Sequence, residues 1–350
     1  MKKKIAVGLS GGIDSSFAAY LLKKEGWDTV GFTLKFYPEQ NRSCDLKSLY
    51  QARRLCDNLG IPHYVIDVGE LFKKEIINYF INSYLAGTTP NPCAFCNRLI
   101  KFGYFFEKIK SLGINYLATG HYARIVKDKD GFLIKPARDQ KKSQEYFLAL
   151  IKKEVLPYLN FPLADFTKEE VKKIAYKEKI MFKERKESQD VCFVKEDSYA
   201  HFIEKNTALS NNFTGEIKHI NGKLLGRHKG IHYFTCGQRE GLGIAYKEPL
   251  YVVSIDARTK TVIVGEKKYL AKNSFTVSAF NWFISQVPSA NLKVKIRYNS
   301  PLYNCKLEFK DDRALVLLKE SVNAITPGQV DAFYEDDSLI GGGIIEKIES

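Results

Sequence analysis

The chain has 350 residues, of which 45% are hydrophobic, so it is long enough for two or three domains with sizeable cores. Its 54 Lys and Arg outnumber its 40 Asp and Glu, and the net charge of +14 favours a polyanionic partner such as RNA, DNA or a membrane surface, although a solvated lysine-rich surface gives the same charge. No run of about 18 apolar residues is present for a membrane span, and the apolar part of MKKKIAVGLS is too short for a signal peptide, so we expect a cytoplasmic protein.

The first half of the chain alternates between two kinds of pattern. Buried-strand patterns cover residues 4–9, 28–37, 62–68 and 115–123, and helical patterns cover residues 14–26, 46–60, 70–87 and 98–113. Strands that alternate with helices predict an α/β fold with a parallel sheet and crossover helices.

The pattern changes near residue 205. Short strand-like runs separated by glycine-marked turns follow, and the Asn221-Gly222 pair between two such runs is a hairpin signal. We therefore expect three domains: residues 1–204 with the parallel sheet, a small central domain over residues 205–268, and a C-terminal β-barrel over residues 269–350.

The segment GLSGGIDSS, residues 8–16, joins the first predicted strand to the first predicted helix. A glycine-rich turn in this place directs free backbone N–H groups and the positive end of a helix toward an anion. The glycines allow close approach of the backbone, the serines add hydroxyl donors, and Asp14 suits a helix cap or Mg²⁺. No lysine follows the glycines, so this is not a loop that transfers a γ-phosphate.

The SGGxDS pattern of this segment resembles the pyrophosphatase loop of enzymes that cleave ATP between its α and β phosphates and attach AMP to an oxygen. NAD, GMP and argininosuccinate synthetases have similar loops. The pattern therefore indicates the chemistry and leaves the substrate open.

Five further motifs distinguish among the enzymes that have such a loop. They are TPNPCAFCNRLIKFG, ATGHYAR, ESQDVCFV, GQREGLGI and TPGQ, and they occur in this order. Together they resemble the tRNA-specific 2-thiouridylase family over roughly residues 4–345. The resemblance implies an adenine-nucleotide α-hydrolase-like parallel-sheet domain, a small central domain and a β-barrel that contacts tRNA. It also implies the reaction: ATP and Mg²⁺ adenylate the C2 oxygen of the wobble uridine in tRNAs for lysine, glutamate and glutamine, and sulfur then replaces that oxygen.

The same resemblance implies the site residues. Cys96 matches the nucleophile, Cys192 matches the persulfide-carrying cysteine, and Asp14 lies in the catalytic loop. The implied ATP-binding residues are Gly8, Leu9, Ser10, Gly11, Gly12, Ile13, Asp14, Ser15, Leu34 and Gly120. The implied tRNA-contacting residues are Asn91, Pro92, Cys93, His121, Lys142, Ser143, Gln144, Arg297, Tyr298 and Gln329. The implied partners are tRNA and a sulfur donor protein or free sulfide, with no membrane.

The chain departs from the commoner family pattern at three places. Cys93 stands where the usual motif has Asp, Leu34 replaces Met, and residues 142–147 read KSQEYF in place of Lys-Asp-Gln-Ser-Tyr-Phe.

The cysteines allow two routes for sulfur. A helix N-terminus would lower the pKa of Cys96 and favour its thiolate. If Cys93, Cys96 and Cys192 converge, three thiolates can hold a 4Fe–4S cluster with one iron open to bind hydrosulfide. Alternatively, Cys192 carries a persulfide and Cys96 forms a disulfide with it. The two routes weigh about equally, with a slight preference for the cluster, while structural zinc usually takes four ligands and no nearby fourth is evident.

Two rival functions belong to other classes. A small-molecule ATP pyrophosphatase, such as an amide-forming synthetase, explains the loop but neither the three cysteines nor the basic β-rich C-terminal part. A non-catalytic RNA-binding protein with a relic loop explains the charge, and it would bind tRNA without turning over ATP.

Overall fold

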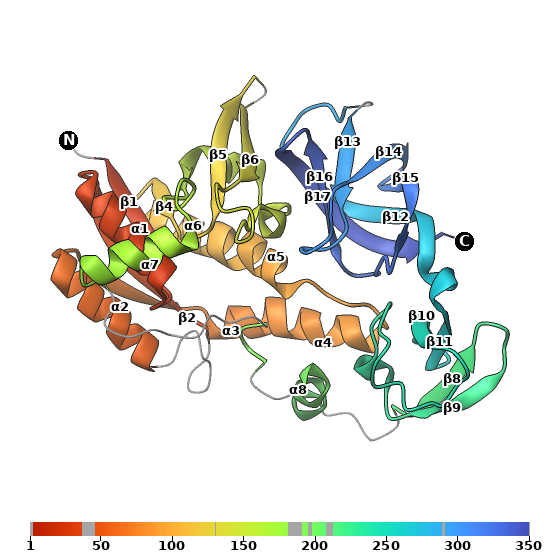
Figure 1. The fold of residues 1–350 in the computed structure, drawn as a ribbon. Coiled ribbons are helices and arrows are strands. Elements are labelled where there is room, and N and C mark those ends of the chain that lie inside the picture. Colours follow the sequence, from red (N-terminus) through yellow and green to blue (C-terminus); the bar gives the residue numbers. More distant parts are fainter. Residues whose placement is uncertain are drawn as a thin grey trace.

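The computed structural model describes residues 3–36, 46–129, 131–180, 191–194, 198–207, 213–288 and 291–349. Its N-terminal part is built on a five-stranded parallel sheet in the order β3-β2-β1-β4-β7 (Figure 1). The strands are β1 (Lys4–Gly8), β2 (Asp28–Lys35), β3 (His63–Asp67), β4 (Tyr116–Ala118) and β7 (Leu159–Asn160). The central strand β1 is apolar throughout its buried stretch because helices cover both faces of the sheet. The predicted parallel α/β fold is confirmed.

Most of the helices belong to this N-terminal part. They are α1 (Ile13–Lys24), α2 (Leu46–Leu59), α3 (Gly69–Phe72), η1 (Lys73–Ile77), α4 (Asn78–Leu85), α5 (Pro92–Cys96), η2 (Asn97–Tyr104), α6 (Phe105–Ser111), η3 (Glu145–Leu148), η4 (Lys153–Tyr158), α7 (Lys168–Lys177) and α8 (Tyr199–Asn206). Two runs are continuous helices with a π-helical middle, α3–η1–α4 and α5–η2–α6. Such π segments often occur at functional sites, and the second run contains two of the cysteines.

A hairpin that the sequence reading did not anticipate leaves the parallel sheet. It consists of β5 (Ala123–Asp128) and β6 (Gly131–Pro136), and Ile134 pairs with Leu339 of a C-terminal strand. Figure 1 shows the hairpin standing beside the barrel. The N-terminal part therefore contributes two strands to the sheet of the C-terminal part.

The central part is a four-stranded sheet in the order β10-β11-β8-β9. It contains β8 (Gly215–His219), β9 (Leu224–His228), η5 (Ile231–Tyr233), β10 (Leu250–Asp256) and β11 (Thr261–Glu266), and η6 (Lys267–Leu270) follows it. Strands β8 and β9 pair antiparallel across the predicted turn, where Gly222 has a positive φ of 91°. The hairpin predicted from Asn221-Gly222 is confirmed.

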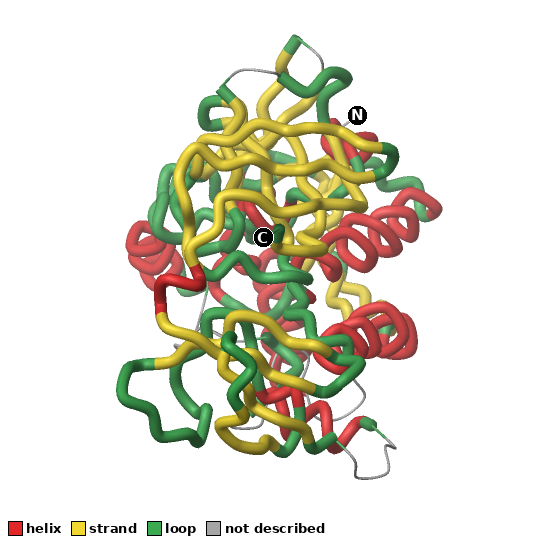
Figure 2. The backbone as a smooth tube through the Cα atoms, turned by 90° about the vertical axis from the view of Figure 1, so that its right-hand side faces the viewer, coloured by secondary structure: helices red, strands yellow, loops and turns green. Residues whose placement is uncertain are grey.

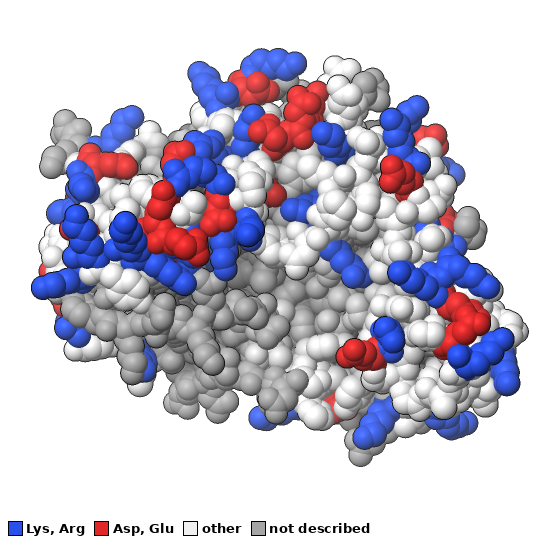
Figure 3. Space-filling model, in the orientation of Figure 1, with Lys and Arg blue, Asp and Glu red and all other residues white. Residues whose placement is uncertain are grey.

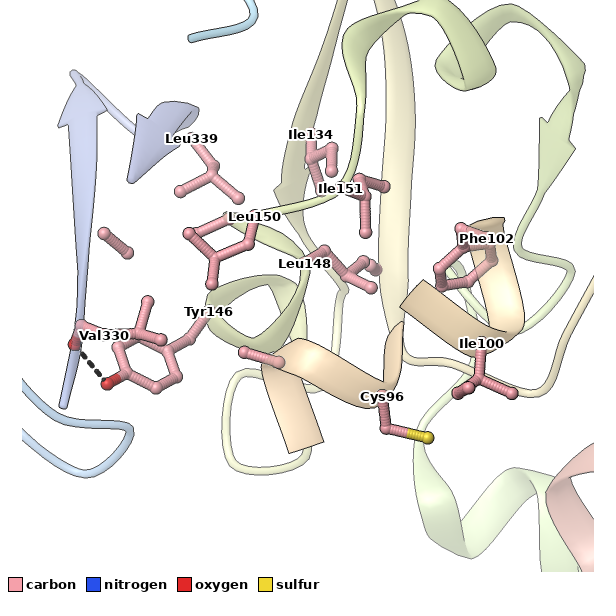
Figure 4. Packing of buried hydrophobic residues seen from close by; sticks show 14 of the residues in the cluster. Cys96, Ile100, Phe102, Ile134, Tyr146, Leu148, Leu150, Ile151, Val330 and Leu339 are labelled. Carbon is pink, nitrogen blue, oxygen red and sulfur yellow. Dashed lines mark hydrogen bonds between the residues drawn. The ribbon is translucent and has the colours of Figure 1, made fainter. Parts of the chain in front are cut away.

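The C-terminal part is a closed six-stranded barrel, seen above the small central sheet in Figure 2. Its strands are β12 (Ala271–Trp282), β13 (Leu292–Lys295), β14 (Tyr303–Lys310), β15 (Arg313–Asn323), β16 (Val330–Glu335) and β17 (Ser338–Ile348). One cluster of buried residues runs from the parallel-sheet part into the barrel. Within it the Tyr146 hydroxyl donates to the Val330 carbonyl at 2.6 Å (Figure 4). The predicted order of α/β part, small central part and β-barrel is confirmed.

None of the helices in the described ranges combines the length and the apolar character needed to cross a membrane.

Candidate active site

The loop between β1 and α1 is held in shape by its own serines. The backbone N–H of Ser10 donates to Ser15 Oγ at 3.1 Å, and Ser15 Oγ donates to the Gly12 carbonyl at 3.1 Å. Gly11 has a positive φ of 72°, which favours glycine, and Gly12 is the N-cap of the 12-residue helix α1. The expected helix cap by Asp14 is wrong, because the cap position falls on Gly12 and the loop turns two residues earlier.

A pocket of about 700 Å³, counting its open mouth, lies against this loop. Its lining residues are Gly8, Leu9, Ser10, Ser15, Phe32, Leu34, Phe36, Lys101, Phe105, Thr119, Gly120 and His121. Seven of the residues implied by the resemblance are among them, while Gly11 and Gly12 of the loop and Ile13 and Asp14 at the start of α1 do not line the pocket. The loop and the first turn of α1 at Ser15 line one side, and the Phe and Leu side chains form an apolar wall, an arrangement that suits phosphates and a purine base.

Gly120, two residues after the end of β4, lies directly against the first turn of α1. A Cβ at this position would be 2.6 Å from the backbone nitrogen of Ser15. The residue therefore allows the end of β4 to contact the first turn of α1 and closes one side of the pocket.

Asp14 has a partner that the sequence did not reveal. Lys168 Nζ lies 2.8 Å and 2.7 Å from the two Asp14 carboxylate oxygens, and the Tyr122 hydroxyl donates to the same carboxylate at 2.9 Å. The Lys168 side chain is 4% exposed and that of Asp14 is 32% exposed, so the pair lies at the edge of the interior. Lys168 is the first residue of α7, where Thr167 and Glu170 form a capping box.

The helix that carries two of the cysteines starts earlier than expected. The Asn91 side chain accepts the backbone N–H of Ala94 at 3.2 Å, and Pro92 is the first helical residue. Cys93 therefore lies in the first turn, whereas Cys96 lies at the end of α5 and the helix continues into η2. The prediction that Cys96 lies at a helix N-terminus is wrong, because the helix begins at the Asn-Pro pair and not after the second cysteine. Figure 4 shows Cys96 at the edge of the buried cluster.

The two cysteines of this helix differ in exposure. Cys96 is buried, while the Cys93 thiol is open to solvent although it lies within the body of the molecule. Burial by the surrounding protein and, to a smaller extent, the charge of the nearby Cys192 raise the pKa of Cys93 to about 11, while the Lys101 charge acts in the opposite direction. Cys93 is therefore a protonated thiol at neutral pH, and Cys192 lies within electrostatic reach of it.

Cys192 lies in a short turn, half-buried, and the Phe193 ring next to it anchors the turn. That ring packs edge-on against Phe72 and Phe80 at ring-centre distances of 5.6 Å and 5.2 Å. The first four residues of the ESQDVCFV motif, residues 187–190, lie outside the described residues.

The three cysteines implied as cluster ligands stay a prediction. Cys93 and Cys96 lie on the same short helix, and the charge of Cys192 acts on the Cys93 thiol, so Cys192 lies near this helix. Among the residues that the structure describes, no three His, Cys, Asp or Glu side chains lie close enough together to share one metal ion. The thiolates of a 4Fe–4S cluster bind different irons, so this finding bears on a single-ion site and not on a cluster.

The sequence did not single out Lys101, a cation that acts on both the pocket and one of the thiols. Lys101, on η2, lines the pocket, and its charge acts on both Cys93 and His121. His121 is paired through Nδ1 with Thr119 Oγ1 at 2.7 Å, and burial together with the Lys101 charge lowers its pKa well below the usual range. His121 is therefore neutral at physiological pH.

In the KSQEYF segment, two of the side chains implied to contact tRNA form hydrogen bonds within the protein instead. Ser143 Oγ accepts the Ala137 backbone N–H at 3.0 Å, and the Gln144 side chain accepts the Tyr122 backbone N–H at 3.0 Å. Ser143 Oγ also donates to the Glu145 carboxylate at 2.5 Å, so the hydroxyl and the acid, which stand in the reverse order to the Asp and Ser of the commoner pattern, form a hydrogen-bonded pair here. Lys142 is partly exposed beside them.

The implied contacts on the barrel are likewise engaged within the molecule. Tyr298 packs on Phe147 with ring centres 4.6 Å apart. Arg297 Nη2 donates to the Cys236 carbonyl at 3.2 Å, and Gln329 Nε2 donates to the Thr89 carbonyl at 2.9 Å.

Charged side chains are spread over the face shown in Figure 3. Lys and Arg outnumber Asp and Glu over the parallel-sheet part and the central part, but acidic side chains lie among them. The net charge of +14 therefore does not gather into one uninterrupted patch on this face.

Three family models match the chain in succession. They are described as the tRNA methyl transferase HUP domain over residues 3–196, the tRNA methyl transferase PRC-barrel domain over residues 200–266, and the aminomethyltransferase beta-barrel domain over residues 272–345.

Curated relatives match along their whole length. The chain is 43% identical to the tRNA-specific 2-thiouridylase MnmA of Aquifex aeolicus (strain VF5), covering 98% of this chain and 99% of the relative. It is 44% identical to the protein of the same name in Hydrogenobaculum sp. (strain Y04AAS1), over 97% and 99%. A third relative of that name, in Clostridioides difficile (strain 630), is 38% identical over 99% of each chain.

Proposed function

Because the chain belongs to the tRNA-specific 2-thiouridylase family, we propose that it replaces the C2 oxygen of the wobble uridine in tRNAs for lysine, glutamate and glutamine with sulfur. ATP activates that oxygen and is cleaved to AMP and pyrophosphate. The observation that carries the proposal is the pocket at the SGGIDSS loop, whose lining residue Lys101 also acts on the thiol of Cys93. The activating nucleotide and the sulfur chemistry would thus meet at one place.

In the first step the C2 oxygen of the uridine attacks the α-phosphorus of ATP. A bond forms between this oxygen and phosphorus, the bond from the α-phosphorus to the bridging oxygen breaks, and pyrophosphate leaves with the electron pair. The loop's backbone N–H groups and the start of α1 bind the phosphates, and Lys101 places a positive charge at the pocket wall.

Asp14 is the carboxylate next to the loop that would hold Mg²⁺, an ion that usually takes one or two carboxylates together with substrate phosphates. Lys168 Nζ lies within 2.8 Å of both Asp14 oxygens and Asp14 does not line the pocket, so Mg²⁺ would have to replace Lys168 at this carboxylate. When bound, Mg²⁺ would neutralise charge on the phosphates. Without the ion, Asp14 holds the Lys168 ammonium group beside the start of α1.

The second step transfers sulfur from a persulfide on Cys192, which a sulfur donor protein supplies. The outer sulfur, after losing its proton, attacks C2 of the adenylated uridine, and AMP leaves with the former C2 oxygen. The Cys96 thiolate then attacks Sγ of Cys192. The bond between this Sγ and the transferred sulfur breaks, the electron pair stays on the uridine sulfur, and Cys96 and Cys192 are left as a disulfide that a thiol reductant reopens.

We propose the persulfide route because it needs only Cys96 and Cys192, whereas the cluster route, which is the alternative, needs Cys93 as a third thiolate ligand. Iron and sulfide analysis of anaerobically purified protein tests this choice. Full activity with a persulfide donor and without iron agrees with it, whereas activity that depends on bound iron contradicts it.

The experiment that tests the proposed function measures the products of ATP in the presence of purified tRNA and a persulfide donor. The wild type is expected to release AMP and pyrophosphate and to form 2-thiouridine. Asp14→Ala should abolish all three products. Asp165→Asn is the matched control, because Asp165 pairs with Arg124 on the surface and its side chain is 70% exposed.

The same assay separates the rival functions. Release of AMP without RNA would indicate a small-molecule synthetase, and tRNA binding without ATP turnover would indicate an RNA-binding protein. A tRNA methyl transferase, the activity in the descriptions of two of the matching family models, would modify tRNA without forming AMP and pyrophosphate.

A further inference from the structure

The segment just before the two cysteines is enclosed by all three parts of the molecule. Gly87 has a positive φ of 75°, and a Cβ there would lie 3.0 Å from the Ile255 side chain of the central sheet. The Thr89 hydroxyl donates to that of Thr235, also in the central part, at 3.3 Å. On the barrel side, the Thr89 backbone N–H donates to the Pro327 carbonyl at 2.8 Å.

Gln329 of the barrel makes the most specific contact with this segment. Its side-chain amide donates to the Thr89 carbonyl at 2.9 Å and to the Pro90 carbonyl at 3.1 Å. One side chain thus binds the carbonyl groups of two successive residues that lie outside any helix or strand. The preceding residue, Gly328, has a positive φ of 90°, and a Cβ there would lie 2.9 Å from the Thr88 side chain and the Thr89 backbone. The turn that carries Gln329 is therefore in direct contact with the segment.

Arg297 connects the same turn to the central part. Its Nη2 donates to the Cys236 carbonyl at 3.2 Å and to Thr326 Oγ1, which lies in the turn before Gly328. Thr326 is 1% exposed, so this link is enclosed by protein. Close packing continues at Gly237, where a Cβ would lie 2.5 Å from the Ala324 side chain.

The residue that follows Pro90 starts the cysteine helix. Asn91 is the N-cap of α5, and Cys93 and Cys96 follow within the next five residues. Fixing the carbonyls of Thr89 and Pro90 therefore fixes where this helix begins and which way its first turn faces. A loosened anchor would misplace both thiols relative to the nucleotide pocket.

We propose that Gln329, supported by Arg297, is a positioning residue: it holds the loop at residues 88–91 from the barrel, so that the barrel sets the placement of the catalytic thiols. The resemblance to the thiouridylases implies a tRNA contact for both residues, whereas their hydrogen bonds here are made to the protein. The inference rests on the proposed function only for the role of Cys96 in sulfur transfer. The anchoring of the loop by Gln329 does not depend on that function.

The test compares Gln329→Ala with the wild type by three readouts. Alkylation of Cys96 by iodoacetamide, followed by peptide mass spectrometry, should become about 5- to 25-fold faster, the range expected when one or both of the Gln329 hydrogen bonds stabilise the anchored loop by about 1 kcal/mol each. The kcat of thiolation should fall, and the Kd for tRNA should stay unchanged. Cys305, a barrel thiol that is 7% exposed, serves as internal control, and its alkylation should not change.

Two further variants keep the result interpretable. Thr89→Val removes the hydroxyl contact with Thr235 from the loop side and should also accelerate alkylation of Cys96. Thr276→Val is the matched control, because it removes a barrel hydrogen bond to Glu349 that is remote from the loop. It should behave as the wild type does in all three readouts.

A weaker tRNA affinity with unchanged Cys96 alkylation in Gln329→Ala would overturn the proposal and assign Gln329 to tRNA binding. Faster alkylation of Cys305 as well would also overturn it, since the effect would then be a general loosening of the barrel. If the wild type forms no 2-thiouridine, the proposed function fails, but the alkylation of Cys96 still decides whether Gln329 positions the loop.

Discussion

At the scale of single residues, Asp331 on β16 is a buried acid that takes no part in the proposed reaction. It is fully buried, and neither carboxylate oxygen has a hydrogen-bond partner among the described residues. Burial raises the pKa of this carboxyl to about 7, although the nearby backbone N–H groups of Asp331 and Gly343 offset part of the effect. The barrel interior thus contains an acid that is close to its midpoint at physiological pH.

We predict that Asp331 makes the barrel less stable as the pH rises. The carboxyl ionises near its ordinary pKa in the unfolded chain and near 7 in the folded protein, so stability is lost from about pH 4 upward until the folded form has ionised. The Asp331→Asn variant does not lose this stability. The difference in free energy of unfolding between the variant and the wild type should therefore grow by about 2–3 kcal/mol from about pH 5 to pH 8.

Urea unfolding followed by tryptophan fluorescence measures this difference. The chain has two tryptophans, and replacing Trp27 with Phe leaves Trp282, on the barrel strand β12, as the reporter. A constant difference between the two proteins across this pH range would show that Asp331 does not titrate there.

Residue-level predictions from the sequence succeeded where a local motif specifies the contact. The loop residues from Gly8 to Ser15 were recognised from SGGIDSS, and seven implied residues line the pocket. Lys168 and Lys101 were missed, because a lysine has no local signature and only the tertiary fold places it beside its partner. Lys168 lies 154 residues from Asp14 along the chain.

At the scale of elements, the contact between β4 and the loop gives a sharp prediction. Gly120→Ala would place a Cβ 2.6 Å from the Ser15 nitrogen, so the loop or the strand end must move. AMP formation should fall by about tenfold or more, while the far-ultraviolet circular dichroism stays the same.

The matched control for this glycine is Gly226→Ala in the central sheet. There the only atom within 4 Å of the new Cβ is the Cγ2 methyl group of Ile244, at 3.1 Å, and it needs to shift by only a few tenths of an ångström, so AMP formation should be unchanged. Equal activity of Gly120→Ala and the wild type would mean that the loop tolerates displacement and that the close contact is irrelevant to turnover.

The periodicity of the sequence predicted most elements but not how they join. The β5–β6 hairpin was overlooked although Asp-Gly at residues 130–131 is a turn signal, because the alternating pattern around it was not separated from the neighbouring helices. The start of α5 was placed too late, since an Asn-Pro pair at the N-cap and N1 positions can also be interpreted as a loop. Pairing of the hairpin with β17 is a long-range contact that no local pattern encodes.

At the scale of the whole molecule, the net charge of +14 predicts how tRNA binding depends on salt. Binding that neutralises several phosphates releases counterions, so the affinity for tRNA should fall by about tenfold or more between about 50 mM and 200 mM salt. Filter-binding titrations at a series of salt concentrations measure the slope. An affinity that stays flat over this range would exclude an interface dominated by phosphate contacts.

The order of the three parts was predictable, and their mutual contacts were not. Alternation of strands and helices, followed by glycine-marked strands, indicates the succession of folds. The anchor between Gln329 and the loop at residues 88–91 joins segments about 240 residues apart, so it exists only in the folded chain.

The claim that the uridine C2 oxygen is adenylated has one direct test. A tRNA labelled with oxygen-18 at C2 of the wobble uridine is thiolated with unlabelled ATP, and the AMP that is released is analysed by mass spectrometry. Attack of the C2 oxygen on the α-phosphorus predicts one heavy oxygen in each AMP formed per 2-thiouridine. Unlabelled AMP alongside 2-thiouridine, or ADP in place of AMP, would contradict the account.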